Sequence, residues 1–195
     1  KIVKKILFIF SILMFALNFA QSTNIDAKIT FVDGKELSSK IRFRTSIFYE
    51  NEIYENSITQ KYVVLINEKG KKEKHLFNEF KRIEFTDLKG KTRIFERPIE
   101  KFGLFELIYD GKKMKWYRDY TENMYDHSQD YYELLYKNPE QYDTFNLLTN
   151  YKKRLKELTS DRQDLVSEIE ACNFFNNTYE CFKKIVEKYN EERDI

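Results

Sequence analysis

Between Ala27 and about Tyr120, apolar and polar residues alternate with the two-residue period of β-strands. In Lys40–Arg44, the apolar side chains would point to one face of a strand and the cationic side chains to the other. Four of the five glycines separate such runs, as in Asp33-Gly34, and glycine readily adopts the positive φ that tight hairpin turns require. We therefore predict strands connected by hairpins over residues 27–32, 36–44, 60–67, 72–77, 80–87, 91–97 and 104–118, the last one divided at Gly111.

One of these runs, Tyr62 to Ile66, is apolar at every position, which predicts a central strand covered on both faces. Within the segment 119–146, which is rich in Tyr, Asp and Asn, the residues from Tyr131 to Lys137 predict one more strand. Helical spacers of the kind that parallel strands require are missing from this half of the sequence. We therefore expect residues 21–146 to form an antiparallel sheet or open barrel of about seven to eight strands.

From residue 147 onward, the hydrophobic pattern changes to the three- and four-residue spacing of amphipathic helices. The apolar positions fall into three groups: Leu147, Leu148, Tyr151, Leu155 and Leu158; Leu165, Val166 and Ile169; and Phe182, Ile185, Val186 and Tyr189. No linker rich in Pro, Gly or Ser separates the two halves, so we expect about three helices over residues 147–195 to pack on the sheet. Strands followed by helices predict the α+β class.

The first twenty residues have the layout of a secretory signal peptide. Three lysines within the first five residues precede an apolar run from Ile6 to Phe19, and the small residue Ala20 comes before a polar stretch. The run is shorter than the roughly 20 residues that a membrane-spanning helix needs. We expect cleavage after Ala20 and a protein that is periplasmic or secreted. An uncleaved N-terminal anchor is the alternative.

Composition and charge narrow the classes of protein further. The chain has only 5 Gly and 2 Pro, which excludes collagen-like and low-complexity sequences, and its 17 Phe and 14 Tyr argue against disorder. The net charge is +2, and without the first twenty residues 31 basic side chains face 32 acidic ones. Because no basic excess remains, we expect no nucleic-acid partner.

Several of these features resemble small exported proteins of Gram-negative bacteria whose function is unknown. The resemblance depends on Asp33-Gly34 followed by Ile41-Arg42-Phe43, on Glu79 to Phe85, on Asp110-Gly111, and on the segment from Leu165 to Asn190. It covers most of the chain after residue 20 and implies an antiparallel β domain with a helical C-terminal tail in the cell envelope. It carries over no catalytic residue.

The search for catalytic chemistry gives few candidates. The chain has two histidines; His75 lies in a basic segment and is expected at a solvated strand edge, whereas His127 stands in a cluster with Asp, Ser and Tyr. There is no Gly-x-Ser-x-Gly turn, no Gly-rich phosphate loop and no close pair of Cys or His suited to zinc. We therefore predict no catalytic residue, no metal site and no cofactor.

A run of aromatic residues gives the one indication of ligand binding. Trp116, Tyr117, Tyr120 and Tyr125 lie close together in sequence, among acidic and amide residues and near His127. Rings with polar neighbours suit sugars or extended peptides. The alternative is that these rings fill the interface between sheet and helices, since tyrosine is common in strands.

The two cysteines, Cys172 and Cys181, are expected near the end of one helix and the start of the next. In an oxidising compartment they would form a disulfide across this helix–loop–helix. Two buried thiols on helix faces are the alternative.

Together these observations predict an exported, non-catalytic envelope protein that binds another envelope protein, a peptide or a glycan. The alternative is a small secreted hydrolase whose acidic residues converge only in the fold. A third hypothesis is contact with the outer membrane through two basic groups, Lys69–Lys74 and Lys112–Lys115.

Overall fold

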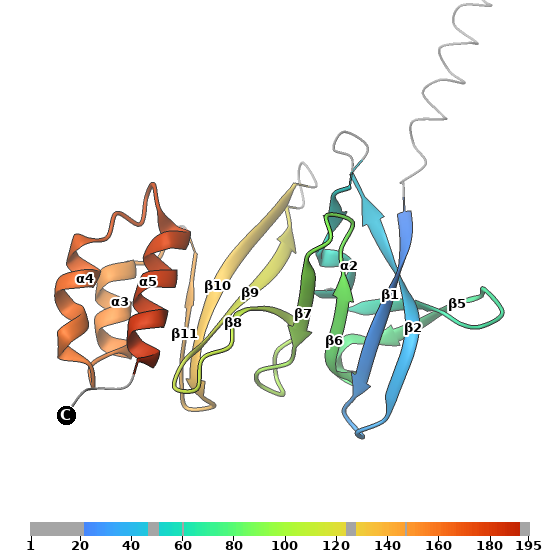
Figure 1. Cartoon of the computed structure of the whole chain (residues 1–195), viewed down its shortest axis with the longest axis horizontal. Helices are drawn as coiled ribbons and strands as arrows, with labels where there is room; N and C mark the ends of the chain where they lie inside the picture. The colour runs from blue at the N-terminus through green and yellow to red at the C-terminus, as the bar shows by residue number, and fades with distance from the viewer. Residues whose placement is uncertain (1–21, 47–50, 60, 124–127, 147, 192–195) are drawn as a thin grey trace, which may run out of the picture.

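Eleven strands form one antiparallel sheet in this computed structural model, which describes residues 22–46, 51–59, 61–123, 128–146 and 148–191 (Figure 1). The strands are β1 (Ser22–Phe31), β2 (Glu36–Thr45), β3 (Ile53–Tyr54), β4 (Tyr62–Ile66), β5 (Lys72–Leu76), β6 (Phe80–Thr86), β7 (Thr92–Glu96), β8 (Phe105–Tyr109), β9 (Lys115–Glu122), β10 (Gln129–Asn138) and β11 (Gln141–Phe145). Their order across the sheet is β11-β10-β9-β8-β7-β6-β1-β2-β4-β5, and β3 pairs with β2.

The antiparallel sheet and the α+β class are confirmed, but the predicted strand count is wrong. The described residues contain eleven strands rather than seven to eight, because β3 and β11 are additional and the run 104–118, which the prediction divides at Gly111 but counts once, forms the two strands β8 and β9. The predicted central strand, Tyr62–Ile66, lies next to the edge strand β5, and only Val63 and Leu65 in it are buried. Its continuous apolar run therefore belongs to a strand that is covered on one face.

The sheet curls until β9 approaches β2, and the short helix α2 (Asn56–Thr59) bridges the two strands. The hydroxyl of Thr59 donates a 2.8 Å hydrogen bond to the carbonyl of Tyr120, and Arg44 Nη2 lies 2.7 Å from Glu122 Oε2. The curled face encloses a first core, whose fully buried members include Ile29, Ile41, Phe43, Ile58, Val63, Phe80, Ile83 and Phe95.

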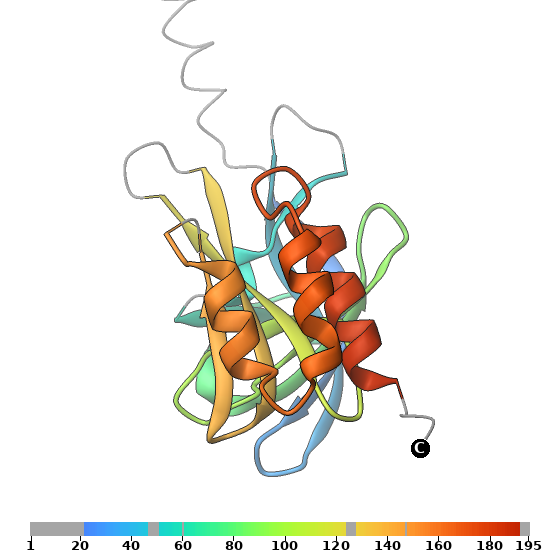
Figure 2. The same cartoon turned by 90° about the vertical axis from the view of Figure 1, so that its left-hand side faces the viewer.

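Three C-terminal helices cover β9, β10 and β11: α3 (Tyr151–Leu158), α4 (Val166–Ala171) and α5 (Thr178–Asn190) (Figure 2). With α2 the described residues contain four α-helices, one more than predicted, because α2 lies within the β region. The second core lies between these helices and the sheet, and it includes Trp116, Leu135, Phe145, Leu155, Leu165, Ile169, Phe182, Ile185 and Val186. Among the described residues, no helix is both long enough and apolar enough to cross a membrane.

A row of four charged side chains, three of them buried and Arg118 partly buried, crosses the sheet between the two cores. Arg93 on β7, Glu106 on β8, Arg118 on β9 and Glu133 on β10 alternate in sign from strand to strand. Arg118 Nη2 lies 2.5 Å from Glu133 Oε1, and the indole of Trp116 donates a 2.8 Å hydrogen bond to the same carboxylate. Buried charges are tolerated only when they are paired in this way. Such costly groups are often functional, so this row is a candidate for a functional site.

Candidate functional site

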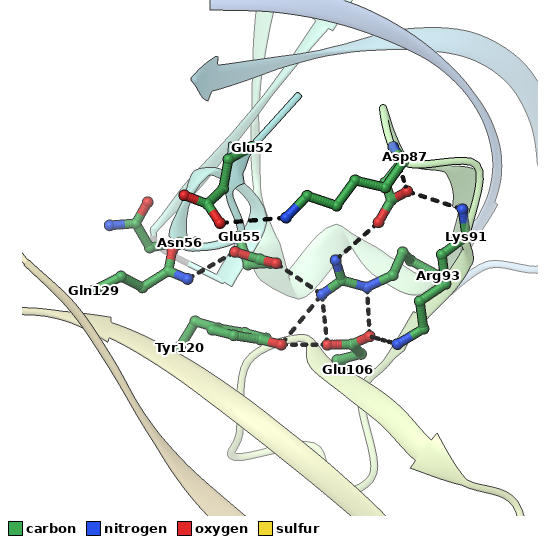
Figure 3. Close-up of polar contacts among 10 residues, drawn as sticks. Glu52, Glu55, Asn56, Asp87, Lys91, Arg93, Glu106, Tyr120 and Gln129 are labelled. Carbon is green, nitrogen blue, oxygen red and sulfur yellow. Dashed lines mark hydrogen bonds and ion pairs between the residues drawn. The ribbon is translucent and has the colours of Figure 1, made fainter. Parts of the chain in front are cut away.

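Arg93 stands at the centre of a cluster of polar side chains, and Figure 3 shows its neighbours. Alternation along β7 turns Arg93 to the same face as Phe95, and Phe85 is its register partner on β6. The side chain therefore enters the curled interior, where it is 8% exposed. Its Nε and Nη2 donate hydrogen bonds of 2.5 Å and 2.6 Å to the two oxygens of Glu106. This is the bidentate geometry in which a guanidinium binds a carboxylate most strongly.

Three more groups complete the shell around the guanidinium. Nη2 of Arg93 lies 2.9 Å from Glu55 Oε1, and Nη1 lies 3.4 Å from Asp87 Oδ2. The hydroxyl of Tyr120 accepts a 3.2 Å hydrogen bond from Arg93 and donates one to Glu106. Two of these carboxylates come from loops and one from a strand, so the cluster fixes the positions of three separate segments.

The electrostatics of the cluster keep Arg93 and Tyr120 in their protonated forms. Burial alone would lower the pKa of Arg93, but the hydrogen bonds and negative charge of Glu106 outweigh it, and the pKa is raised. Burial, followed by the charge of Glu106, raises the pKa of Tyr120. At neutral pH the guanidinium is therefore charged and the phenol keeps the proton that it donates.

A cavity of about 420 Å³ lies beside this cluster. Its lining comprises Asn51, Glu52, Ile53, Tyr54, Glu55, Asp87, Lys89, Arg93, Ser128 and Gln129. We call it the Arg93 cavity. Its volume falls in the range of about 300–1,000 Å³ that is typical of small-molecule sites. Glu52 Oε1 lies 3.3 Å from Lys89 Nζ, and the amide of Gln129 donates a 2.7 Å hydrogen bond to Glu55. The walls thus present donors and acceptors that are already held in place.

A second hollow, the hairpin groove, lies between the β1–β2 and β4–β5 hairpins and has a volume of about 680 Å³. Its apolar lining includes Ala27, Phe31, Leu37, Leu65 and Ile66, and its polar lining includes Lys35, Lys40, Glu68, Glu73 and His75. The two hollows share no lining residue.

His75 lies on the edge strand β5, but it is not fully solvated, because its side chain is only 26% exposed. Its ring lies 6.1 Å from that of Phe31 and 5.9 Å from that of Phe80. Its Nδ1 lies 3.0 Å from Glu79 Oε2, and this hydrogen bond lowers the pKa of Glu79. His75 thus forms part of one wall of the hairpin groove.

Of the predicted aromatic residues, the three that the structure describes lie in three different apolar clusters. Trp116 lies in the core under the helices, Tyr120 in the core of the curled sheet, and Tyr117 in a small cluster with Phe105. All three rings are at most 8% exposed, so they form no common binding surface. Tyr125 and His127 lie outside the described residues, and so does the predicted signal peptide.

Cys172 and Cys181 are both thiols in this structure. Cys172 ends α4, and Cys181 lies in the first turn of α5. Burial, followed by the hydrogen bond that the Cys172 thiol makes to Cys181, raises the pKa of Cys172 to about 12. In the described part of the chain, no group of three or more His, Cys, Asp or Glu residues is arranged to hold a metal ion.

The residues that build the Arg93 cavity were not among the sequence-based candidates. The signal that identifies Arg93 is its register, since it shares a strand face with Phe95 and is separated from it by Ile94. Glu106 similarly lies between two apolar residues in a strand. A cation and an anion at buried strand positions predict internal ion pairs. The sequence does not show, however, that these two residues pair with each other.

Comparison with known proteins adds no relative: no protein-family model, no curated protein and no solved structure matches this chain.

Proposed function

We propose that this chain is an exported, non-catalytic binding protein of the cell envelope, and that it holds a polar ligand in the Arg93 cavity. Export is supported by the signal-peptide layout of residues 1–20 and by the resemblance to small exported Gram-negative proteins. The main support for binding rather than catalysis is that the buried carboxylates of the cavity already accept hydrogen bonds from other groups of the protein.

Each of these acids has a structural task. Glu55 accepts hydrogen bonds from Arg93 through one oxygen and from Gln129 through the other. Asp87 accepts 2.9 Å hydrogen bonds from the amides of Lys89 and Lys91, which close the β6–β7 turn. General acid–base catalysis needs a group whose proton is free to move at the working pH. Carboxylates fixed in this way suit binding better than proton transfer.

The lining also indicates the class of ligand. The three carboxylates around the cavity would repel an anionic ligand, and the buried guanidinium of Arg93 would repel a metal ion. Hydroxyl groups both donate and accept hydrogen bonds, so a neutral glycan could bond to cationic donors and carboxylate acceptors together. The ring of Tyr54 adds the apolar surface on which a sugar can pack. We therefore propose a neutral glycan as the ligand.

Calorimetric titration of the full chain with three neutral trisaccharides (maltotriose, cellotriose and the N-acetylglucosamine trimer) tests this function. We expect one of them to bind and Gln129→Ala to weaken that binding at least tenfold. Gln141→Ala, on the far edge strand β11, should leave it within twofold. Failure of all three sugars to bind would contradict the proposed ligand. Release of shorter sugars during the titration would instead support the alternative, a secreted hydrolase.

Export makes a separate prediction about the N-terminus. In cell fractionation, we expect the protein in the periplasm or the medium, with a mass that corresponds to loss of the first twenty residues. An intact protein in the cytosol would contradict export. A cleaved protein that sediments with the outer membrane and is released by salt would support contact through its basic hairpins.

We also propose that Cys172 and Cys181 form a disulfide in the exported protein. The two thiols are already neighbours, and an oxidising compartment favours their oxidation. Mass measurement after alkylation, with and without reductant, decides between the bridge and two buried thiols. Two alkylated cysteines in the unreduced, unfolded protein would exclude the bridge.

A further inference from the structure

Part of strand β2 has a strand partner on one side only. β4 pairs with β2 at two positions, Lys40 with Ile66 and Ile41 with Leu65, and then leaves it. The residues Glu36–Ser39 pair with β1 on their other side, and no other strand of the described residues pairs with them. Figure 1 shows the β4–β5 hairpin extending away from β2. The backbone of Glu36–Ser39 therefore forms a short open edge inside the sheet, which ends at Ser39, whose hydroxyl donates a 3.1 Å hydrogen bond to the carbonyl of Ile66 on β4.

This open edge differs from the outer edge of the sheet. Strand β5, at the end of the sheet, has the sequence Lys-Glu-Lys-His-Leu, and charged side chains of this kind protect an edge from pairing with other chains. The open edge of β2 has one charged residue, Glu36, and its other three residues, Leu37-Ser38-Ser39, carry no charge. It is therefore open to an added strand.

The hairpin groove lies directly beside this edge. Leu37 and Ser39 line it together with Ala27 and Leu65, which lie on the same face of the sheet. Leu37 is 37% exposed, although it is an apolar residue on the concave face. An extended peptide along β2 would point every second side chain into this apolar hollow.

We propose that Glu36–Ser39 and the hairpin groove bind an extended peptide segment of a partner protein as an added β-strand. In this mode of recognition, main-chain hydrogen bonds supply affinity, and pockets for alternate side chains supply specificity. The groove takes small apolar side chains at alternate positions of the peptide. The site shares no residue with the Arg93 cavity, so it does not depend on the proposed glycan.

Charge complementarity defines the peptide further. Glu36, Ser38 and Lys40 alternate with Leu37 and so point to the other face of the strand. Opposite charges on neighbouring strands attract, and like charges repel. The peptide should therefore carry a cation near Glu36 and an anion near Lys40, the two charged residues that flank Leu37–Ser39 on this strand. Its pattern is a charged residue at each end and apolar residues at alternate positions between them.

The probe is a capped, fluorescently labelled heptapeptide, Lys-Val-Thr-Val-Thr-Val-Glu, used together with the peptide of reversed order so that both strand directions are covered. Fluorescence anisotropy should show that one of the two binds. Two N-methylated versions of that peptide, methylated along one edge or along the other, test strand pairing directly. We expect one pattern to weaken binding at least tenfold and the other to change it less than twofold. Failure of both peptides to bind, or equal tolerance of both patterns, would overturn the proposal.

A protein variant checks the groove separately. Leu37→Asp should weaken peptide binding at least tenfold, because it places a charge in the apolar hollow. Val32→Asp is the matched control: it lies beside the same hairpin turn, is 51% exposed, and does not line the groove. Hydrogen exchange of the amides of residues 36–39 should slow when the peptide binds. If lauric acid displaces the peptide and exchange at these amides does not change, the groove is a site for apolar ligands and no strand is added.

Discussion

The Arg93 cavity and the hairpin groove lie at opposite ends of β2, and they differ in how far their polar groups are hydrogen-bonded within the protein. In the cavity, Arg93, Glu55 and Glu106 are bonded to one another before any ligand arrives. Beside the groove, the backbone of Glu36–Ser39 has no strand partner on one side among the described strands. A site with fixed polar groups suits a small ligand of defined shape, whereas an open edge suits a segment of chain. The protein therefore has two sites that suit two different kinds of partner.

The largest expected effect comes from breaking the ion cluster. Arg93→Met should lower the free energy of unfolding by about 3–5 kcal/mol, because it leaves buried carboxylates without their cation. The control is Arg82→Met on the neighbouring strand β6, where the side chain is 35% exposed and pairs with Glu84 and Glu96. An exposed pair contributes about 1 kcal/mol or less. Equal losses in urea denaturation would show that burial does not distinguish the two arginines.

Asp119, outside both hollows, gives a prediction with a defined pH dependence. Burial raises the pKa of Asp119 to about 6, against the opposing hydrogen bond from Tyr132. The folded state then binds this proton more tightly than the unfolded state, so its contribution to stability falls as the pH rises from about 4 to about 6. At most about 3 kcal/mol is lost, at about 1.36 kcal/mol per pKa unit.

Asp119→Asn removes this charge and keeps an oxygen that can accept from Tyr132. We expect the variant to be more stable than the native protein at pH 7 and similar to it at pH 4. Urea denaturation at both pH values measures the difference. A variant that is less stable at pH 7 would contradict the assigned cause.

The cysteine pair should have the next largest effect. In the oxidised protein, replacing both Cys172 and Cys181 by Ser should cost about 2.7 kcal/mol on the chain-entropy estimate for a loop of about ten residues. After full reduction, the native protein and the double variant should unfold at closely similar temperatures. The same difference with and without reductant would mean that packing, and not a bridge, accounts for it.

The smallest effect is expected in the hairpin groove. Leu37→Asp should change the free energy of unfolding by about 1 kcal/mol or less, because the residue is already partly exposed. Leu65→Asp, on the same face but 3% exposed, should prevent folding or destabilise the protein by several times as much. If the two variants were equally destabilised, Leu37 would be a core residue and not part of a binding surface.

The hairpins could be predicted from sequence because local chemistry determines them. Gly34, Gly70 and Gly90 adopt the positive φ expected of turn glycines. Gly111 serves a different purpose, since a Cβ atom there would lie 2.3 Å from the carbonyl oxygen of Met114 and from the side chain of Asn190. Its contact partner on α5 is distant in sequence, so no local pattern reveals it.

The short strands, the helix α2 and the curl of the sheet depend on contacts between distant segments. β3 has only two residues, and α2 is held by β9 through Thr59. Part of the arrangement of the rings follows from sequence, since Trp116 and Tyr117 are adjacent in a strand and therefore point to opposite faces. The Arg93 cavity needs residues from four separate segments, and sequence spacing cannot bring these together.

A crystal structure of the full chain with the trisaccharide that binds it tests the proposed site most directly. We expect the sugar to lie in the Arg93 cavity, within hydrogen-bond distance of Glu52 or Gln129, and Arg93 to keep its bonds to Glu106. A sugar bound elsewhere on the protein, with this cavity unchanged, would contradict the proposed site.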